Sequence, residues 1–159
     1  MVLPRKYHRG RLVREIRVFG LYDVTTKKEV IQIIYDRTRN TLLPLIERYV
    51  VPGSIIHSDQ WASYMGGAIT AIPVIPPYIH NSVNHHHNFC PQDGTRTNDV
   101  ECFWKNMKMK FKAMSGTKRA LLAGYLDEFL WRQYNGNKTL TVFDNLLEQI
   151  SQYYIVNTD

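Results

Sequence analysis

Two runs of β-branched and aromatic residues near the start of the chain constrain its fold most. The first run covers residues 12–24 and the second residues 29–35, and the polar stretch 25–28 (TTKK) separates them. Runs of this composition favour β-strands, and a short polar connection between two such runs favours an antiparallel hairpin. We therefore expect the first third of the chain to supply two paired strands of a sheet.

Helical periodicity replaces this pattern from residue 40 onward. Apolar residues recur at helical spacing after Asn40, which we expect to cap the helix, and Pro52-Gly53 ends it. Pro44 is expected in the first turn, where a helix tolerates proline. Three further helices are predicted over residues 97–114, 117–134 and 139–154. The first of them carries an apolar stripe of Val100, Phe103, Trp104, Met107, Phe111 and Met114.

A short strand pattern at residues 54–57 ends in Ser58-Asp59, and residues 60–64 are typical of the start of a short helix. Asp59 therefore stands at the carboxyl end of a strand, where open α/β sheets place their sites. Residues 66–96 are irregular by composition, which indicates either a functional loop or short strands that the pattern does not resolve. Together the patterns predict one α/β domain over residues 1–159.

Charge and composition narrow the classes of function. A net charge of +6 and a pI near 9.4 favour a polyanionic partner such as nucleic acid, although a solvated basic surface would give the same balance. No apolar run approaches the roughly 18 to 20 residues of a membrane span, and the first residues lack the apolar core of a secretion signal. We expect an intracellular protein with no membrane partner, in which Cys90 and Cys102 are free thiols.

Two acidic residues are candidates for a metal site. Asp59 ends a strand and Glu101 lies early in a predicted helix, and in an α/β fold such a pair can converge on one divalent cation. Mg²⁺ prefers oxygen ligands and needs few carboxylates when substrate phosphates supply the rest. The alternative assigns Asp59 to capping the following helix and Glu101 to pairing with Lys105 one turn later.

Several strings of the sequence are informative when they are taken in order. They are RKYHRGR (5–11), VFG (18–20), RT with TL (37–38 and 41–42), SDQWASY (58–64), H with VNH (80 and 83–85), NF (88–89) and GTRTNDVECFW (94–104). As a set they resemble the DDE transposase domain of bacterial insertion sequences and eukaryotic Merlin elements, the ISXO2-like transposases. The resemblance runs from about Arg5 to Tyr134.

This resemblance implies an RNase H-like fold, a mixed sheet flanked by helices, with a carboxylate triad that uses Mg²⁺ or Mn²⁺ to cut and join DNA strands. The second Asp of the family matches Asp59, and the third position falls on either Asn98 or Glu101. Asp59 and Glu101 would be the metal ligands. The lysine of the family signature matches Lys108, with Lys105 as the alternative. The implied partners are transposon ends and target DNA, and the resemblance is also compatible with a homo-oligomer. The expected location is the nucleus if the source is eukaryotic and the cytoplasm otherwise.

One departure from the family concerns the first catalytic Asp. In the family it lies on a strand before the RKY string, where this sequence has only residues 1–4 (MVLP), and neither Asp23 nor Asp36 matches the motif. We expect a transposase-derived domain that lacks its first central strand, has unpaired strand edges there, and is catalytically incomplete. The alternative is a non-catalytic DNA- or protein-binding remnant of a transposable element.

Side chains suited to DNA contact occur in the basic entry segment, around Asp59 and on the helix after Glu101. The candidates are Arg5, Lys6, Arg9, Arg11, Trp61, His85, Lys105 and Lys112. Trp104 lies on the apolar stripe and is expected in the core. A zinc site is an alternative for the histidines and cysteines of this region, because these side chains are zinc ligands. They are His80, His85, His86, His87, Cys90 and Cys102. Their spacing matches no zinc-finger pattern.

Overall fold

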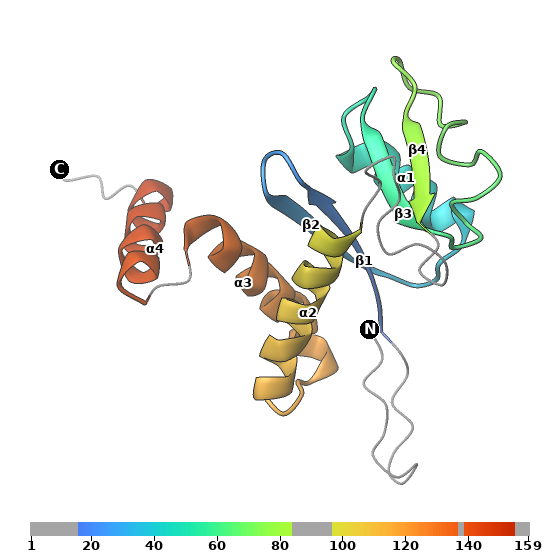
Figure 1. Cartoon of the computed structure of the whole chain (residues 1–159). Coiled ribbons are helices and arrows are strands. Elements are labelled where there is room, and N and C mark those ends of the chain that lie inside the picture. The colour runs from blue at the N-terminus through green and yellow to red at the C-terminus, as the bar shows by residue number, and fades with distance from the viewer. Residues whose placement is uncertain (1–15, 84–96, 137–138, 155–159) are drawn as a thin grey trace, which may run out of the picture. The chain divides into compact units, whose positions relative to one another are not determined.

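The computed structural model describes residues 16–83, 97–136 and 139–154 (Figure 1). The chain divides into two compact units, Met1–Asn106 and Met107–Asp159. Within the described ranges the fold is mixed α/β, with two separate two-stranded sheets in the first unit and four α-helices along the chain. No helix in these ranges is both long and apolar enough to cross a membrane.

The predicted hairpin is confirmed. Strand β1 (Arg17–Asp23) pairs antiparallel with β2 (Lys28–Ile34), and the ladder ends at the pair Asp23↔Lys28. The carboxylate of Asp23 closes the turn by accepting hydrogen bonds from the backbone N–H of Thr25 at 2.8 Å and the hydroxyl of Thr26 at 2.6 Å. Asp23 is therefore committed to the turn chemistry of the hairpin.

Helix α1 (Arg39–Tyr49) starts one residue before the predicted cap. Its N-cap is Thr38, so the assignment of Asn40 as the cap was wrong. The Thr38 side chain makes no capping bond, and the carboxylate of Asp36 holds this helix start instead, accepting from the backbone N–H of Thr38 at 3.0 Å and the hydroxyl of Thr41 at 2.6 Å. Because the helix begins at Arg39, Pro44 lies beyond its first turn, contrary to expectation, and removes one helical hydrogen bond.

The second sheet carries the strand that ends in Asp59. Strand β3 (Ile55–Asp59) pairs parallel with β4 (Ile79–Val83), in register from Ile55↔Ile79 to Asp59↔Val83. Strand β4 is a short strand within the region that looked irregular in sequence. The segment between the two strands is a series of turns, so the short helix expected at residues 60–64 is not formed. Gly66 and Gly67, both with positive φ, are incompatible with continuing a helix there.

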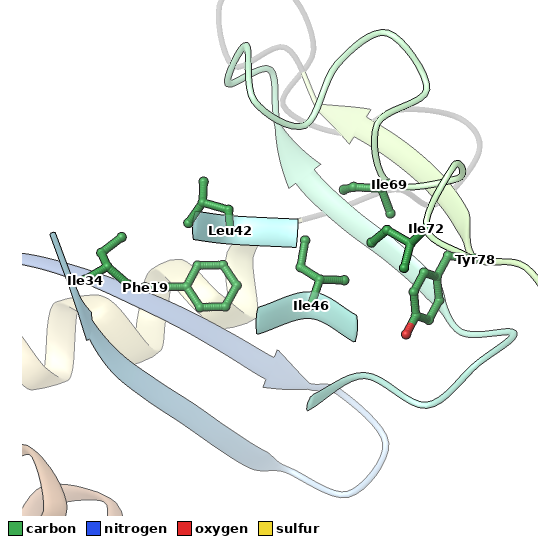
Figure 2. Close-up of a cluster of buried hydrophobic side chains, with 7 residues drawn as sticks. All are labelled: Phe19, Ile34, Leu42, Ile46, Ile69, Ile72 and Tyr78. Carbon is green, nitrogen blue, oxygen red and sulfur yellow. The ribbon is translucent and has the colours of Figure 1, made fainter. Parts of the chain in front are cut away.

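An apolar cluster of described residues joins the hairpin, α1 and the segment before β4 in the first unit. Leu42 and Ile46 of α1 lie between side chains of the hairpin and side chains of the second sheet's connection (Figure 2). The buried members are Phe19, Ile34, Leu42, Ile46, Ile69, Ile72 and Tyr78. The two sheets, which share no ladder within the described residues, are thus joined through the apolar face of one helix.

The predicted apolar stripe of the third helical segment is largely buried. In helix α2 (Asn98–Ala113), Phe103, Met107 and Phe111 are buried, and Trp104 is half-buried against Gly20 of β1. Trp104 therefore packs inside the first unit, as expected.

The last two predicted helices also form. A 3-10 turn, η2 (Arg119–Leu121), leads into α3 (Leu122–Asn135), and α4 (Thr139–Tyr153) follows. Leu126 and Phe129 are buried within the second unit.

Candidate functional site

The carboxylate of Asp59 is presented at the end of the parallel strand pair. Asp59 is the last residue of β3 and is exposed, and its Oδ1 accepts a hydrogen bond from the backbone N–H of Trp61 at 3.2 Å. No other described residue donates to this carboxylate. Asp59 therefore keeps oxygen lone pairs toward solvent, at the place where parallel strands commonly carry ligand sites.

A serine and a histidine hold the backbone at this strand end. The Ser58 hydroxyl donates to the carbonyl of Asp59 at 2.7 Å and lies 2.9 Å from Nε2 of His80 on β4. Because a hydroxyl has one proton, Ser58 accepts from the Nε2–H of His80 while it donates to Asp59. Burial, followed by the nearby charge of His57, lowers the pKa of His80 and so favours the neutral ring, whose Nε2–H tautomer is the one that donates to Ser58.

The loop before α1 is fastened to the turn after Asp59. The backbone carbonyl of Arg37 accepts from the indole N–H of Trp61 at 3.1 Å and from the hydroxyl of Ser63 at 2.6 Å. The guanidinium of Arg39 donates to the carbonyls of Ala62 at 3.3 Å and Met65 at 2.8 Å. These side chain–backbone bonds fix the position of Trp61 relative to Asp59.

The pKa of Tyr64 reflects the charges around the same turn. Burial, and after it the negative charge of Asp59, raise the pKa of Tyr64 to about 12, although the positive charge of Arg37 acts in the opposite direction. The phenol is therefore neutral at physiological pH. Asp59 and Arg37 both lie within electrostatic reach of this one side chain, so the end of β3 has a carboxylate and a guanidinium near each other.

The two alternatives for the third site position lie at the start of α2. The hydroxyl of buried Thr97 donates to the carboxylate of Glu101 at 3.0 Å, and the N–H of Glu101 bonds to the carbonyl of Thr97. Asn98 and Glu101 are both exposed. In the described part of the chain no ion pair joins Glu101 to Lys105.

The metal hypothesis can be tested against the side chains present. Asp59 and Glu101 offer the oxygen donors that Mg²⁺ and Mn²⁺ take. Within residues 16–83, 97–136 and 139–154, however, no three His, Cys, Asp or Glu side chains come together as a metal-binding group. The described residues thus suit the metal in donor chemistry but do not complete a site by themselves. Cys102 is an exposed free thiol.

Other predicted contact residues are distributed along the chain. Lys105, Lys108 and Lys112 are exposed on α2, and Trp61 is 39% exposed beside Asp59. Several predicted residues lie outside the described part of the chain, namely Arg5, Lys6, Arg9, Arg11, His85, His86, His87 and Cys90.

Sequence reasoning missed Arg37 as a functional candidate. Its guanidinium carbon lies 3.8 Å from the centroid of the Trp61 ring, a contact that depends on the fold, so the only sequence signal for Arg37 was its place in the RT string of the family resemblance.

Comparison with known proteins relates this chain to transposases. Over 95 residues, 60% of this chain and 72% of the relative, the sequence is 28% identical to an uncharacterized transposase-like protein of Haemophilus influenzae. The ISXO2-like transposase domain matches residues 4–134, and the chain belongs to that family. No solved structure matches the chain.

Proposed function

We propose that this chain is the DNA-processing domain of a transposase of the bacterial insertion-sequence and Merlin type, with an RNase H-like fold. Its site is built on Asp59 together with Glu101 or Asn98, which hold Mg²⁺ or Mn²⁺ for cleavage and joining of DNA strands. Membership of the ISXO2-like transposase domain family over residues 4–134 is the observation that carries this proposal. The exposed carboxylate of Asp59 at the end of β3 is consistent with it.

The chain's own groups have distinct roles in this proposal. Asp59 supplies an anionic oxygen toward the substrate, while Ser58 and His80 keep its backbone in place through the bonds described above. Lys108, or alternatively Lys105, lies on α2 as an exposed cation for a DNA phosphate. A bound divalent cation would neutralise charge on the attacking and leaving oxygens of the phosphodiester.

A further carboxylate is required to complete this site. Asp23 and Asp36 are engaged in closing the hairpin turn and in holding the start of α1, so neither supplies it. A strand that ends in Asp and pairs between β1 and β3 would both add the carboxylate and join the two sheets. The packing on α1 supports this part of the proposal, because the hairpin and the connection of the second sheet already contact the same helix.

A strand-cleavage assay tests the proposed activity. Duplex DNA is incubated with Mn²⁺ and three proteins: the chain, its Asp59→Asn variant, and a version with an added N-terminal strand ending in Asp. We expect the chain to bind DNA without cutting it, and the extended version to cut it in a manner that Asp59→Asn abolishes. Asp127→Asn is the control, because Asp127 is an exposed carboxylate on α3.

Each other outcome changes the proposal in a defined way. Cleavage by the unextended chain that Asp59→Asn abolishes would mean that another residue of this chain completes the site. DNA binding without cleavage in the extended version would favour the alternative, a non-catalytic DNA-binding remnant. Binding that does not weaken as salt is raised would exclude the basic residues as phosphate contacts, because such contacts release counterions.

A further inference from the structure

An arginine and a tryptophan form a stacked pair beside Asp59. The guanidinium carbon of Arg37 lies 3.8 Å from the centroid of the Trp61 ring, which is the distance of face-to-face stacking. Arg37 is exposed, and Trp61 is 39% exposed even with the guanidinium on it. The ring therefore offers solvent-accessible aromatic surface next to a positive charge.

The pair is preorganised by bonds that do not involve the stacking itself. The indole N–H of Trp61 is anchored on the Arg37 carbonyl, and the Ser63 hydroxyl shares that acceptor. A second arginine–aromatic pair of the chain, Arg48 over Tyr49 at 5.4 Å, joins neighbouring residues of α1. It is looser, and no hydrogen bond from a described residue anchors its ring. The rigidity of the first pair lowers the entropy that a ligand would lose on stacking there.

The guanidinium of Arg37 is available for a phosphate. No described carboxylate forms an ion pair with Arg37, although Asp59 is near enough to share its influence on Tyr64. Stacking uses one face of the guanidinium, and its N–H donors lie in its plane, pointing outward. The pair thus combines an aromatic surface for a base with donors for the phosphate of the same nucleotide.

We infer that the Arg37–Trp61 pair is a binding site for an unpaired nucleotide of DNA immediately beside Asp59. The inference rests on the proposed function in taking DNA as the ligand. An unpaired base exposes the π-face that stacking requires, whereas in a duplex the neighbouring bases cover that face. The backbone N–H of Trp61 bonds to the Asp59 carboxylate and so places this binding site next to it. The nucleotide held there would be the one adjoining the bond to be cut.

Oligonucleotide binding by the full chain tests this nucleotide-binding site. The probes are a fluorescein-labelled single strand of about 12 thymidines and a duplex of equal length. Binding of each probe is measured by fluorescence anisotropy without divalent cations, at one fixed salt concentration. Trp61→Leu should weaken single-strand binding by about fivefold or more and leave duplex binding nearly unchanged. Trp61→Phe should keep most of the affinity because it keeps the aromatic face. Arg37→Ala should weaken single-strand binding as well.

Arg48→Ala is the matched control, since it removes the same charge from an exposed arginine over an aromatic ring on α1. It should affect the single strand and the duplex alike. Equal losses for Trp61→Leu and Arg48→Ala on the single strand would overturn the inference. So would equal losses for Trp61→Leu and Trp61→Phe, because the anchoring bond rather than stacking would then be what matters.

Photocrosslinking of the wild-type chain covers the case in which Trp61→Leu does not fold. A single strand carrying 5-iodouracil, which crosslinks to stacked aromatic side chains, should attach to the peptide that contains Trp61. Attachment only elsewhere would overturn the inference. The strand-cleavage assay is independent of both measurements. If the version with the added strand never cuts DNA while the chain crosslinks at Trp61, the nucleotide site is retained and the proposed catalysis is lost.

Discussion

The indole ring of Trp104 lies directly against Gly20 of β1. A methyl carbon built on Gly20 would meet Cζ2 of Trp104 at 2.5 Å, closer than real side chains approach one another. Phe103, the neighbour of Trp104 on α2, also meets Tyr22 of β1 with ring centroids 6.4 Å apart. The first turns of α2, where Glu101 lies, are thus held on the hairpin by a contact that only glycine permits.

Gly20→Ala should therefore destabilise the protein. The added methyl group forces Trp104 or the strand to move, and overpacking of this kind costs about 1 to 3 kcal/mol. Thermal unfolding followed by circular dichroism measures the effect. Gly124→Ala is the control: a Cβ at Gly124 meets nothing within 4 Å, and in helix α3 alanine should add about 0.5 to 1 kcal/mol of stability. Unchanged stability of Gly20→Ala would show that the ring does not occupy this position.

Asp36→Asn should weaken the start of α1 in a pH-dependent way. Hydrogen bonds from the Thr41 hydroxyl and from Thr38 lower the pKa of Asp36 below its ordinary value. A lowered pKa in the folded state means that the carboxylate stabilises the protein above the pKa of the unfolded chain. That stability is lost as the pH falls through the folded pKa.

The expected result is a lower melting temperature for Asp36→Asn than for the wild type at pH 7, with a difference that shrinks as the pH is lowered past 4. Melting curves across this range provide the measurement. Asp127→Asn, which alters an exposed carboxylate on α3, should show no comparable trend. A difference that stays constant with pH would argue against the hydrogen-bonded carboxylate.

The neutral imidazole of His80 gives a second pH signature. Its pKa is lowered by burial and then by His57, so the folded protein disfavours the protonated ring. Its contribution to stability is complete above the ordinary pKa of 6.5 and is lost as the pH falls from there. An NMR titration should find the His80 ring titrating below that value. His57→Gln should move it upward, and His80→Gln should flatten the loss of stability between pH 7 and 5.

Gln149 connects the last two helices. Its Oε1 accepts from the indole N–H of Trp131 at 2.7 Å and its Nε2 donates to Oδ1 of Asn135 at 2.7 Å. Gln149→Ala leaves both part-buried partners unsatisfied, which costs about 1 to 3 kcal/mol. Hydrogen exchange in α4 should accelerate. Gln152→Ala, at an exposed position of the same helix, should leave exchange unchanged, and equal effects of the two variants would contradict the role of Gln149.

Local signals predicted the secondary structure well where the sequence has a clear period. The hairpin, α1 and the three later helices follow from apolar spacing alone. Two errors at α1 share one cause: Asp36, which lies before the helix, holds its start, and the sequence gives no measure of which of several polar residues will do so. The turns at residues 60–65 were also misjudged, because the bonds that fix them come from Arg37 and Arg39.

The candidate site was predictable only in part. The position of Asp59 at a strand end follows from the short apolar run before it, and the family resemblance singled out Glu101 and Asn98. The stacking of Arg37 on Trp61 joins residues 24 positions apart in sequence through the fold. The bond between Thr97 and Glu101 was not foreseen, because the sequence offers several polar partners for a carboxylate in the first turn of a helix and does not rank them.

The described strands of the first unit form two separate sheets, and each sheet is attached to α1 in a different way. The hairpin meets α1 through apolar side chains such as Phe19 and Ile34, which attract without fixing direction. By contrast, hydrogen bonds tie α1 to the other sheet's side at both ends, from Arg39 to Met65 and from the Tyr78 hydroxyl to Val50. Packed elements without a shared ladder can shear by small amounts. We therefore expect the hairpin to shift against α1 more easily than the second sheet does. Asp59 ends a strand on the hydrogen-bonded side and should keep its position while the hairpin moves.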